Sequence, residues 1–226
     1  MPNRRNRRRS RLRERTLVVL AAVAAATAVV TTFVTDARAA PGARKASSAA
    51  APAAGPDDDS FYGPPKPLPA GSPGDIVRWR PAVAGAPDVN ASMWQVMYLS
   101  PDVLDHPDAV TGTVLVPKGV DPPTAPIVGF APGTEGPAFR CATSKMIQTG
   151  SYYEQSGVDD LLTSGYAVAL TDYEGYQPTP RTTYVVGRSE GHAVIDMVRA
   201  ATRLPAAGLS PTSKVVFRGY SQGEAQ

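Results

Sequence analysis

Three short runs of consecutive apolar residues constrain the fold of this chain more than any other feature of its sequence. The runs occupy residues 125–133, 166–171 and 214–218. Strands of this length that are apolar throughout are typical of a parallel sheet with both faces buried. Helical patterns, with apolar residues three and four apart, separate the runs at residues 152–163 and 189–203. This alternation predicts the α/β class, with helices packed on a mostly parallel sheet.

Two further strands precede the first apolar run. Residues 91–100 alternate in character with the period of two that a strand requires, and residues 111–117 have the composition of a second strand. The turn at residues 101–108 joins them, so we expect an N-terminal antiparallel hairpin. A short strand at residues 75–80 is expected ahead of it.

The N-terminus has the layout of an export signal. Eight arginines lie within the first 15 residues, and the uncharged apolar run 17–34 follows them. With the small-residue site Ala37-Arg38-Ala39, this predicts a secretory signal at residues 1–39. The run is also close to the roughly 18 residues of a spanning helix, so an uncleaved membrane anchor, with the rest of the chain outside, is the alternative. Because these arginines carry much of the positive charge, the net charge of +3 does not indicate a nucleic-acid partner.

Residues 40–59 are rich in Ala, Pro, Gly, Ser and Asp. Such a segment buries too little apolar surface to offset the entropy of ordering it, so we expect a disordered linker. The folded part is then residues 60–226.

The third apolar run leads directly into Gly219-Tyr220-Ser221-Gln222-Gly223. The pattern G-x-S-x-G between a strand and a helix is the nucleophile elbow of α/β hydrolases. Gly219 and Gly223 lack a Cβ, so the strand and the helix can approach closely around a strained serine. Ser221 is the predicted nucleophile, and the backbone N–H of Gln222 is the predicted donor to an oxyanion.

No base for Ser221 follows it in the sequence. In this fold the order is serine, acid, histidine, whereas both histidines, His106 and His192, precede Ser221. We interpret His106 as a turn residue and His192 as a residue of a helix face. We therefore expect the chain to be the N-terminal piece of a larger enzyme, incomplete after the elbow and inactive by itself.

Several segments together resemble the secretory lipase family, the lipase-A-like triacylglycerol lipases. The resemblance covers about residues 57–223 and rests on three motifs in the same order and spacing. They are Asp172-Tyr173-Glu174-Gly175, Gly187-Arg188-Ser189-Glu190-Gly191 and the elbow. The family implies an α/β hydrolase with a helical lid after the elbow. It also implies hydrolysis of lipid esters by Ser, Asp and His, without a metal or another cofactor.

The resemblance also implies roles for individual residues. Ser221 would be the nucleophile and the N–H of Gln222 one oxyanion donor. The loop at residues 132–136 resembles the place of the second donor, for which we choose the backbone of Thr134, with Gly133 shaping the turn. Asp172 and Glu174 precede the elbow and are interpreted as structural.

Cys141 is the single cysteine. From its chemistry alone it could be a buried apolar residue or half of a disulfide. It resembles a family cysteine that pairs with one further along the chain.

Two other functions remain open at this level. The chain could be a non-catalytic secreted or cell-surface remnant of a hydrolase, because the acid and base are missing. It could also derive from an acyltransferase or peptidase, because fold and nucleophile do not decide the acyl acceptor.

Overall fold

A computed structural model describes residues 53–86 and 89–224 of the 226-residue chain. The predicted signal or anchor at residues 1–39 and residues 40–52 of the predicted linker lie outside these ranges. Among the described residues, no helix combines the length and the apolar character needed to cross a bilayer.

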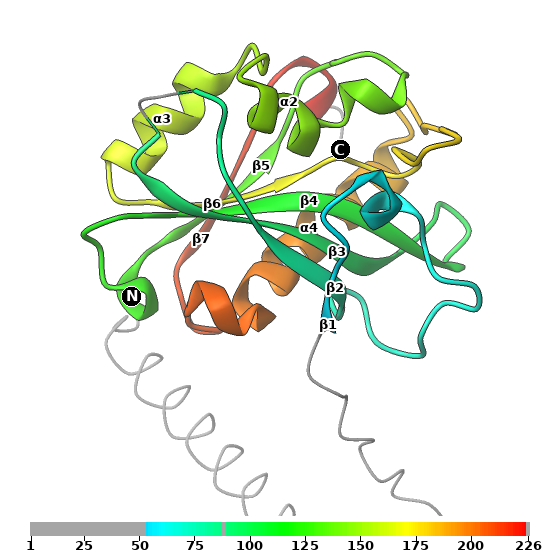
Figure 1. The fold of residues 1–226 in the computed structure, drawn as a ribbon, viewed down its shortest axis with the longest axis horizontal. Helices are drawn as coiled ribbons and strands as arrows, with labels where there is room; N and C mark the ends of the chain where they lie inside the picture. Colours follow the sequence, from blue (N-terminus) through cyan, green and yellow to red (C-terminus); the bar gives the residue numbers. More distant parts are fainter. Residues whose placement is uncertain (1–52, 87–88, 225–226) are drawn as a thin grey trace, which may run out of the picture. The chain divides into compact units, whose positions relative to one another are not determined.

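One seven-stranded sheet forms the centre of the structure, in the order β1-β2-β3-β4-β6-β5-β7 (Figure 1). The α/β class is confirmed, and the sheet is mixed. β5 pairs in parallel with β6 and β7, whereas the pairs β2–β3, β3–β4 and β4–β6 are antiparallel. The strands are β1 (Ala53–Ala54), β2 (Ile76–Ala82), β3 (Ala91–Pro101), β4 (Pro107–Pro117), β5 (Ile127–Ala131), β6 (Ala167–Thr171) and β7 (Val215–Gly219).

The predicted N-terminal hairpin is confirmed. β3 and β4 pair along their whole length, from Ala91 opposite Pro117 to Pro101 opposite Pro107. The turn between them is shorter than the 101–108 predicted, because the pairing continues to the prolines at both strand ends.

Helices cover both faces of the sheet, with α4 on one face and α2 and α3 on the other (Figure 1). In the described part of the chain the helices are α2 (Thr143–Thr149), α3 (Gln155–Thr163) and α4 (Gly187–Arg203). The same part contains the 3₁₀ turns η1 (Asp59–Tyr62), η2 (Pro122–Thr124), η3 (Phe139–Cys141), η4 (Pro205–Ala207) and η5 (Ser221–Glu224). The helix predicted at 152–163 begins later, at Gln155. We did not predict α2, which is too short to show a helical repeat and is capped at its C-terminus by Gly150, with a φ of 68°.

The core alternates between the two faces with the period of the strands. On β4 and β5, Val114 and Ile127 pack in the cluster that contains α4, whereas Leu115 and Val128 pack in the cluster that contains α2 and α3. All five residues of β5 and of β6 are buried. Two of the three apolar runs are therefore buried on both faces, as predicted, although Ile195 of the predicted apolar face of α4 is exposed.

The third apolar run differs from the prediction of a strand buried on both faces. In β7, Val216 is 51% exposed and Phe217 is 58% exposed. Among the described residues, β7 pairs with β5 alone and is the last strand of the sheet. An apolar sequence indicates that a strand suits a buried position, but it does not say which strands occupy the edge.

The end of the predicted linker is also structured. Ala53 and Ala54 form β1, which pairs with β2, and the first residue of η1 lies within the predicted linker. The buried Arg80 holds this segment, because its Nη1 donates to the carbonyl oxygens of Pro56 (2.6 Å) and Asp58 (2.9 Å). Composition did not reveal these bonds, since the segment contributes backbone carbonyls rather than apolar side chains.

The exposed edge of β7 leads to a prediction. An apolar edge strand tends to pair with edges of other molecules, and a lysine on such an edge blocks this pairing. We expect Val216→Lys to weaken self-association of the chain lacking residues 1–39 by at least about tenfold in Kd, measured by sedimentation velocity. Val83→Lys is the matched control, because Val83 is 80% exposed but lies outside β7. Equal effects of the two changes would contradict the role of β7.

Candidate active site

The turn after β7 has the strained geometry that a nucleophile elbow requires. Ser221 is exposed and adopts a φ of 52°, which is rare for a residue other than glycine. A Cβ on Gly219 would lie 2.2 Å from the carbonyl oxygen of Gly223. A Cβ on Gly223 would lie 2.1 Å from the carbonyl oxygen of Ala131 on β5. Both glycines are therefore needed for the close approach of backbone segments.

Gln222, the residue after the serine, is hydrogen-bonded to helix α4. Gln222 is only 6% exposed, and its side-chain Nε2 donates to Glu190 Oε1 at 2.5 Å. The same oxygen accepts the backbone N–H of Val185 at 3.0 Å. Glu190 is fully buried in the first turn of α4. Its position beside Gln222 was not predicted, although Glu190 lies four residues before Val194 on the apolar face of the helix.

The loop after β5 lies beside this turn because β5 and β7 are parallel neighbours that end at the same edge of the sheet. Its Gly133 N–H donates to Glu154 Oε2 at 2.9 Å. The next residue, Thr134, donates from Oγ1 to the hydroxyl of Tyr184 at 3.3 Å. A Cβ on Gly133 would lie 2.0 Å from the Tyr153 hydroxyl, so a larger residue at this position would displace the exposed Tyr153 ring.

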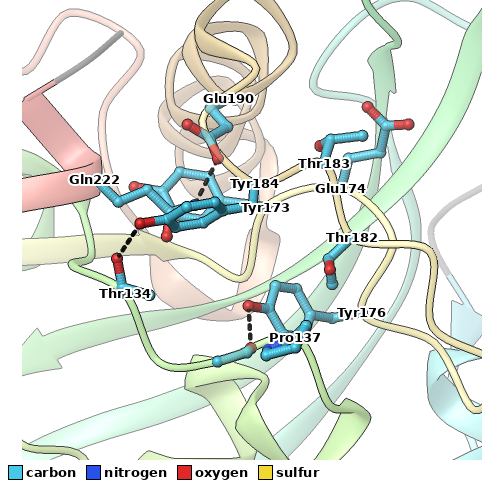
Figure 2. A pocket seen from close by; sticks show the side chains of 11 residues that line it. Thr134, Pro137, Tyr173, Glu174, Tyr176, Thr182, Thr183, Tyr184, Glu190 and Gln222 are labelled. Atoms are coloured by element: carbon cyan, nitrogen blue, oxygen red, sulfur yellow. Dashed lines mark hydrogen bonds between the residues drawn. The ribbon is translucent and has the colours of Figure 1, made fainter.

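A pocket of about 220 Å³ brings the two predicted oxyanion residues together (Figure 2). Thr134 and Gln222 both line it, with the aromatic residues Tyr173, Tyr176 and Tyr184. Two tyrosine hydroxyls brace the loop after β5, since Tyr173 donates to the Pro132 carbonyl and Tyr176 to the Gly136 carbonyl. Ser221 directly precedes Gln222 in the chain, and it does not itself line this pocket.

Glu135, in the loop after β5, is affected by the nearby Glu154. Glu154 accepts from Gly133 and from the Tyr152 hydroxyl, both at 2.9 Å. Partial burial, and secondarily the charge of Glu154, raise the pKa of Glu135 to about 7. Glu135 Oε1 is buried and has no hydrogen-bond partner among the described residues. Glu135 therefore holds its proton to a higher pH than an ordinary glutamate.

Neither histidine is bonded to the nucleophile turn. His106 is exposed, and its Nδ1 lies 3.2 Å from Asp102 Oδ2 in the β3–β4 turn. His192, on α4, has its Nδ1 3.4 Å from the carbonyl oxygen of Pro101. Both contacts agree with the interpretation of these residues as part of a turn and of a helix face.

The two acidic residues after β6 have different surroundings. Asp172 is fully buried and accepts bonds from Thr111 Oγ1 (2.7 Å) and from the backbone and hydroxyl of Ser144 (both 2.6 Å). It thus joins β6 to β4 and to α2, as a structural residue would. Glu174 is bonded to the Ser189 hydroxyl and also lines the pocket, which sequence reasoning did not anticipate.

Cys141 lies in η3 as a free, half-buried thiol that packs against the core. Its pairing with a cysteine further along remains a prediction. Within residues 53–86 and 89–224, no group of three or more His, Cys, Asp or Glu side chains could hold a metal ion.

Comparison with solved structures defines the class of protein. The closed state of Candida antarctica lipase A superposes with a TM-score of 0.63 and 25% identity, over 74% of this chain and 40% of that one. A rice cell wall degrading esterase from Xanthomonas oryzae has a TM-score of 0.50 and 23% identity, over 68% of this chain and 44% of that one. With the elbow geometry, these similarities define an α/β-hydrolase fold.

Sequence comparison identifies the family within this class. Residues 142–225 match the family "Secretory lipase". Lipase 10 of Candida albicans is 32% identical over 178 residues, and a secreted triacylglycerol lipase of Malassezia globosa is 30% identical over 179 residues. The chain belongs to the secretory lipase family. The alignments cover 73% and 74% of this chain but only 37% of each relative.

The strain at Ser221 predicts a gain of stability when it is relieved. A residue with a Cβ in the left-handed region costs about 1–2 kcal/mol relative to glycine. We therefore expect Ser221→Gly to raise the free energy of unfolding in urea by about 1 kcal/mol. Ser221→Ala, which keeps the Cβ, is the control and should be within about 0.5 kcal/mol of the wild type. No difference between the two variants would contradict the strained turn.

The raised pKa of Glu135 predicts a pH dependence. Between pH 4.5 and about 7 the unfolded chain has lost this proton while the folded chain retains it. The native state then binds more protons, so this group lowers stability as pH rises through that window. We expect the Glu135 carboxyl ¹³C resonance to titrate near pH 7 and Glu154→Gln to move its midpoint down. A Glu135 midpoint near 4.5 would contradict this assignment.

Proposed function

We propose that this chain carries the nucleophile of a serine ester hydrolase of the triacylglycerol lipase type, with Ser221 as that nucleophile. The observation that carries the proposal is the strained Ser221 between two glycines, each of which lies too close to neighbouring backbone to carry a Cβ. A pocket lined by both predicted oxyanion residues lies beside it. Membership of the secretory lipase family supports the same reaction.

In this mechanism the Ser221 hydroxyl attacks the ester carbonyl carbon while a general base takes its proton. The carbonyl oxygen becomes an oxyanion, toward which the backbone N–H groups of Gln222 and Thr134 donate. The intermediate collapses to an acyl-serine and expels the alcohol, which receives the proton from the base. Water then attacks the acyl-serine by the same steps and releases the fatty acid. In the family the base is a histidine oriented by an acid, and we assign neither role to a residue of this chain.

The pocket supports an uncharged ester as substrate. Glu174 and Glu190 line it, and none of its lining residues is a lysine, an arginine or a histidine. An anionic ligand would therefore meet negative charge without a compensating cation. We assign the substrate to lipid esters, as the family name and the relatives' names support. Export through residues 1–39, followed by secretion or by anchoring on the outer side of the membrane, fits this substrate.

We expect the 226-residue chain by itself to show no Ser221-dependent turnover of p-nitrophenyl butyrate. Both histidines bond the β3–β4 turn, and loss of the histidine base removes several orders of magnitude of rate. Imidazole in solution can take the place of a missing base. In its presence we expect a butyryl group on the peptide that contains Ser221, detected by mass spectrometry, and none in Ser221→Ala.

The two parts of this experiment have separate outcomes. Turnover without imidazole that Ser221→Ala abolishes would contradict the inactivity of the chain. Failure of imidazole to produce acylation of Ser221, in a protein shown to be folded, would contradict the assignment of the nucleophile.

A further inference from the structure

We propose that Glu190 is a positioning residue that holds the nucleophile turn and the facing pocket wall in place from inside helix α4. The role of Glu190 in catalysis rests on the proposed function. The contacts of Glu190 described below do not depend on that function. Glu190 has no exposed surface, and its Oε1 accepts from Gln222 Nε2 (2.5 Å) and from the Val185 N–H (3.0 Å). Glu190 lies on helix α4, far from Ser221 in the sequence.

These bonds complete a chain of contacts around the pocket. Thr134, in the loop after β5, is bonded to Tyr184, whose neighbour Val185 is bonded to Glu190. Glu190 is bonded in turn to Gln222. Figure 2 shows the first and last of these bonds on one side of the pocket. The two loops with predicted oxyanion donors are therefore connected through one carboxyl group.

The backbone of Val185, within this chain of contacts, is strained. It adopts a φ of 58°, and a β-branched residue with positive φ is a genuine outlier. Such a conformation persists only when surrounding contacts hold it. The bond from its N–H to Glu190 is such a contact.

The choice of a carboxyl group at this position is costly. Burial raises the pKa of Glu190, and its Oε2 is buried without a hydrogen-bond partner among the described residues. An apolar side chain would avoid both costs. The titratable residues that share the pocket are Glu174, Tyr173, Tyr176 and Tyr184, whereas Arg188 and His192 on α4 bond elsewhere. Among the described residues, the hydrogen bonds from Gln222 and Val185 are the interactions of the Glu190 carboxylate that offset this cost.

The test is hydrogen exchange on the full chain, followed by mass spectrometry in the peptide that covers residues 219–224. The Gly223 N–H in this peptide donates to the Tyr220 carbonyl and so reports the closure of the turn. We expect Glu190→Leu to accelerate its exchange at least about tenfold relative to a peptide covering β5. Asp196→Asn is the matched control, because Asp196 is also buried on α4 but is bonded to Ser100.

A second variant covers the possibility that Glu190→Leu does not fold. Gln222→Ala removes the same bond from its other end and should accelerate the same peptide selectively. The comparison is made in whichever of these two variants folds. If hydrogen exchange in residues 219–224 accelerates no more than exchange in β5, Glu190 has only a general structural role and the proposal is overturned.

The pH dependence gives an independent readout. The side-chain amide resonance of Gln222 should titrate with Glu190, at a midpoint above the ordinary value of 4.5. In Glu190→Gln this titration should disappear while exchange of the turn stays within about threefold of the wild type, because an amide oxygen can still accept from Gln222. A Gln222 resonance that titrates unchanged in Glu190→Gln would contradict the proposal. None of these measurements requires turnover, so an unreactive Ser221 would refute the proposed function and leave the positioning result standing.

Discussion

Parallel pairing of β5 with both β6 and β7 is the constraint on which the candidate site depends. Because parallel strands end at the same edge of the sheet, the loops that follow these three strands lie together. One carries Thr134, one carries Glu174 and one carries Ser221. The approach of Gly223 to the Ala131 carbonyl sets how closely β5 and the nucleophile turn meet. A side chain at that position would separate the two loops that line the pocket.

Backbone strain is concentrated around this edge. Four described residues other than glycine have a positive φ, namely Asp105, Tyr173, Val185 and Ser221. Three of them belong to the segments around the pocket, and Asp105 lies in the β3–β4 turn. Strained backbone persists where neighbouring contacts determine it, and it is common at functional sites. Here those contacts include the bond from the Val185 N–H to Glu190 and the glycine contacts of the elbow.

Sequence reasoning was reliable where a local pattern has a single physical meaning. Period-two alternation predicted the β3–β4 hairpin, and the G-x-S-x-G motif predicted the strained turn. It was unreliable where the outcome depends on distant segments. The run at residues 214–218 is apolar enough for a central strand, yet β7 lies at the edge among the described residues. Residues 53–59 have a linker composition, yet Arg80 holds them in place by donating to two of their backbone carbonyls.

By itself, the sequence determined the α/β class, the position of the elbow and the resemblance to secretory lipases. These depend on residue order, on hydrophobic periodicity and on the steric need for glycine, all of which are local. Only the tertiary structure decided that Thr134 and Gln222 share a pocket and that Glu190 joins Gln222 to Val185. Such contacts depend on strand order and on the packing of α4 against the sheet. No local pattern encodes the contact between Glu190 and Gln222, because these residues lie 32 apart along the chain. Thr134 lies further still from Gln222 in the sequence.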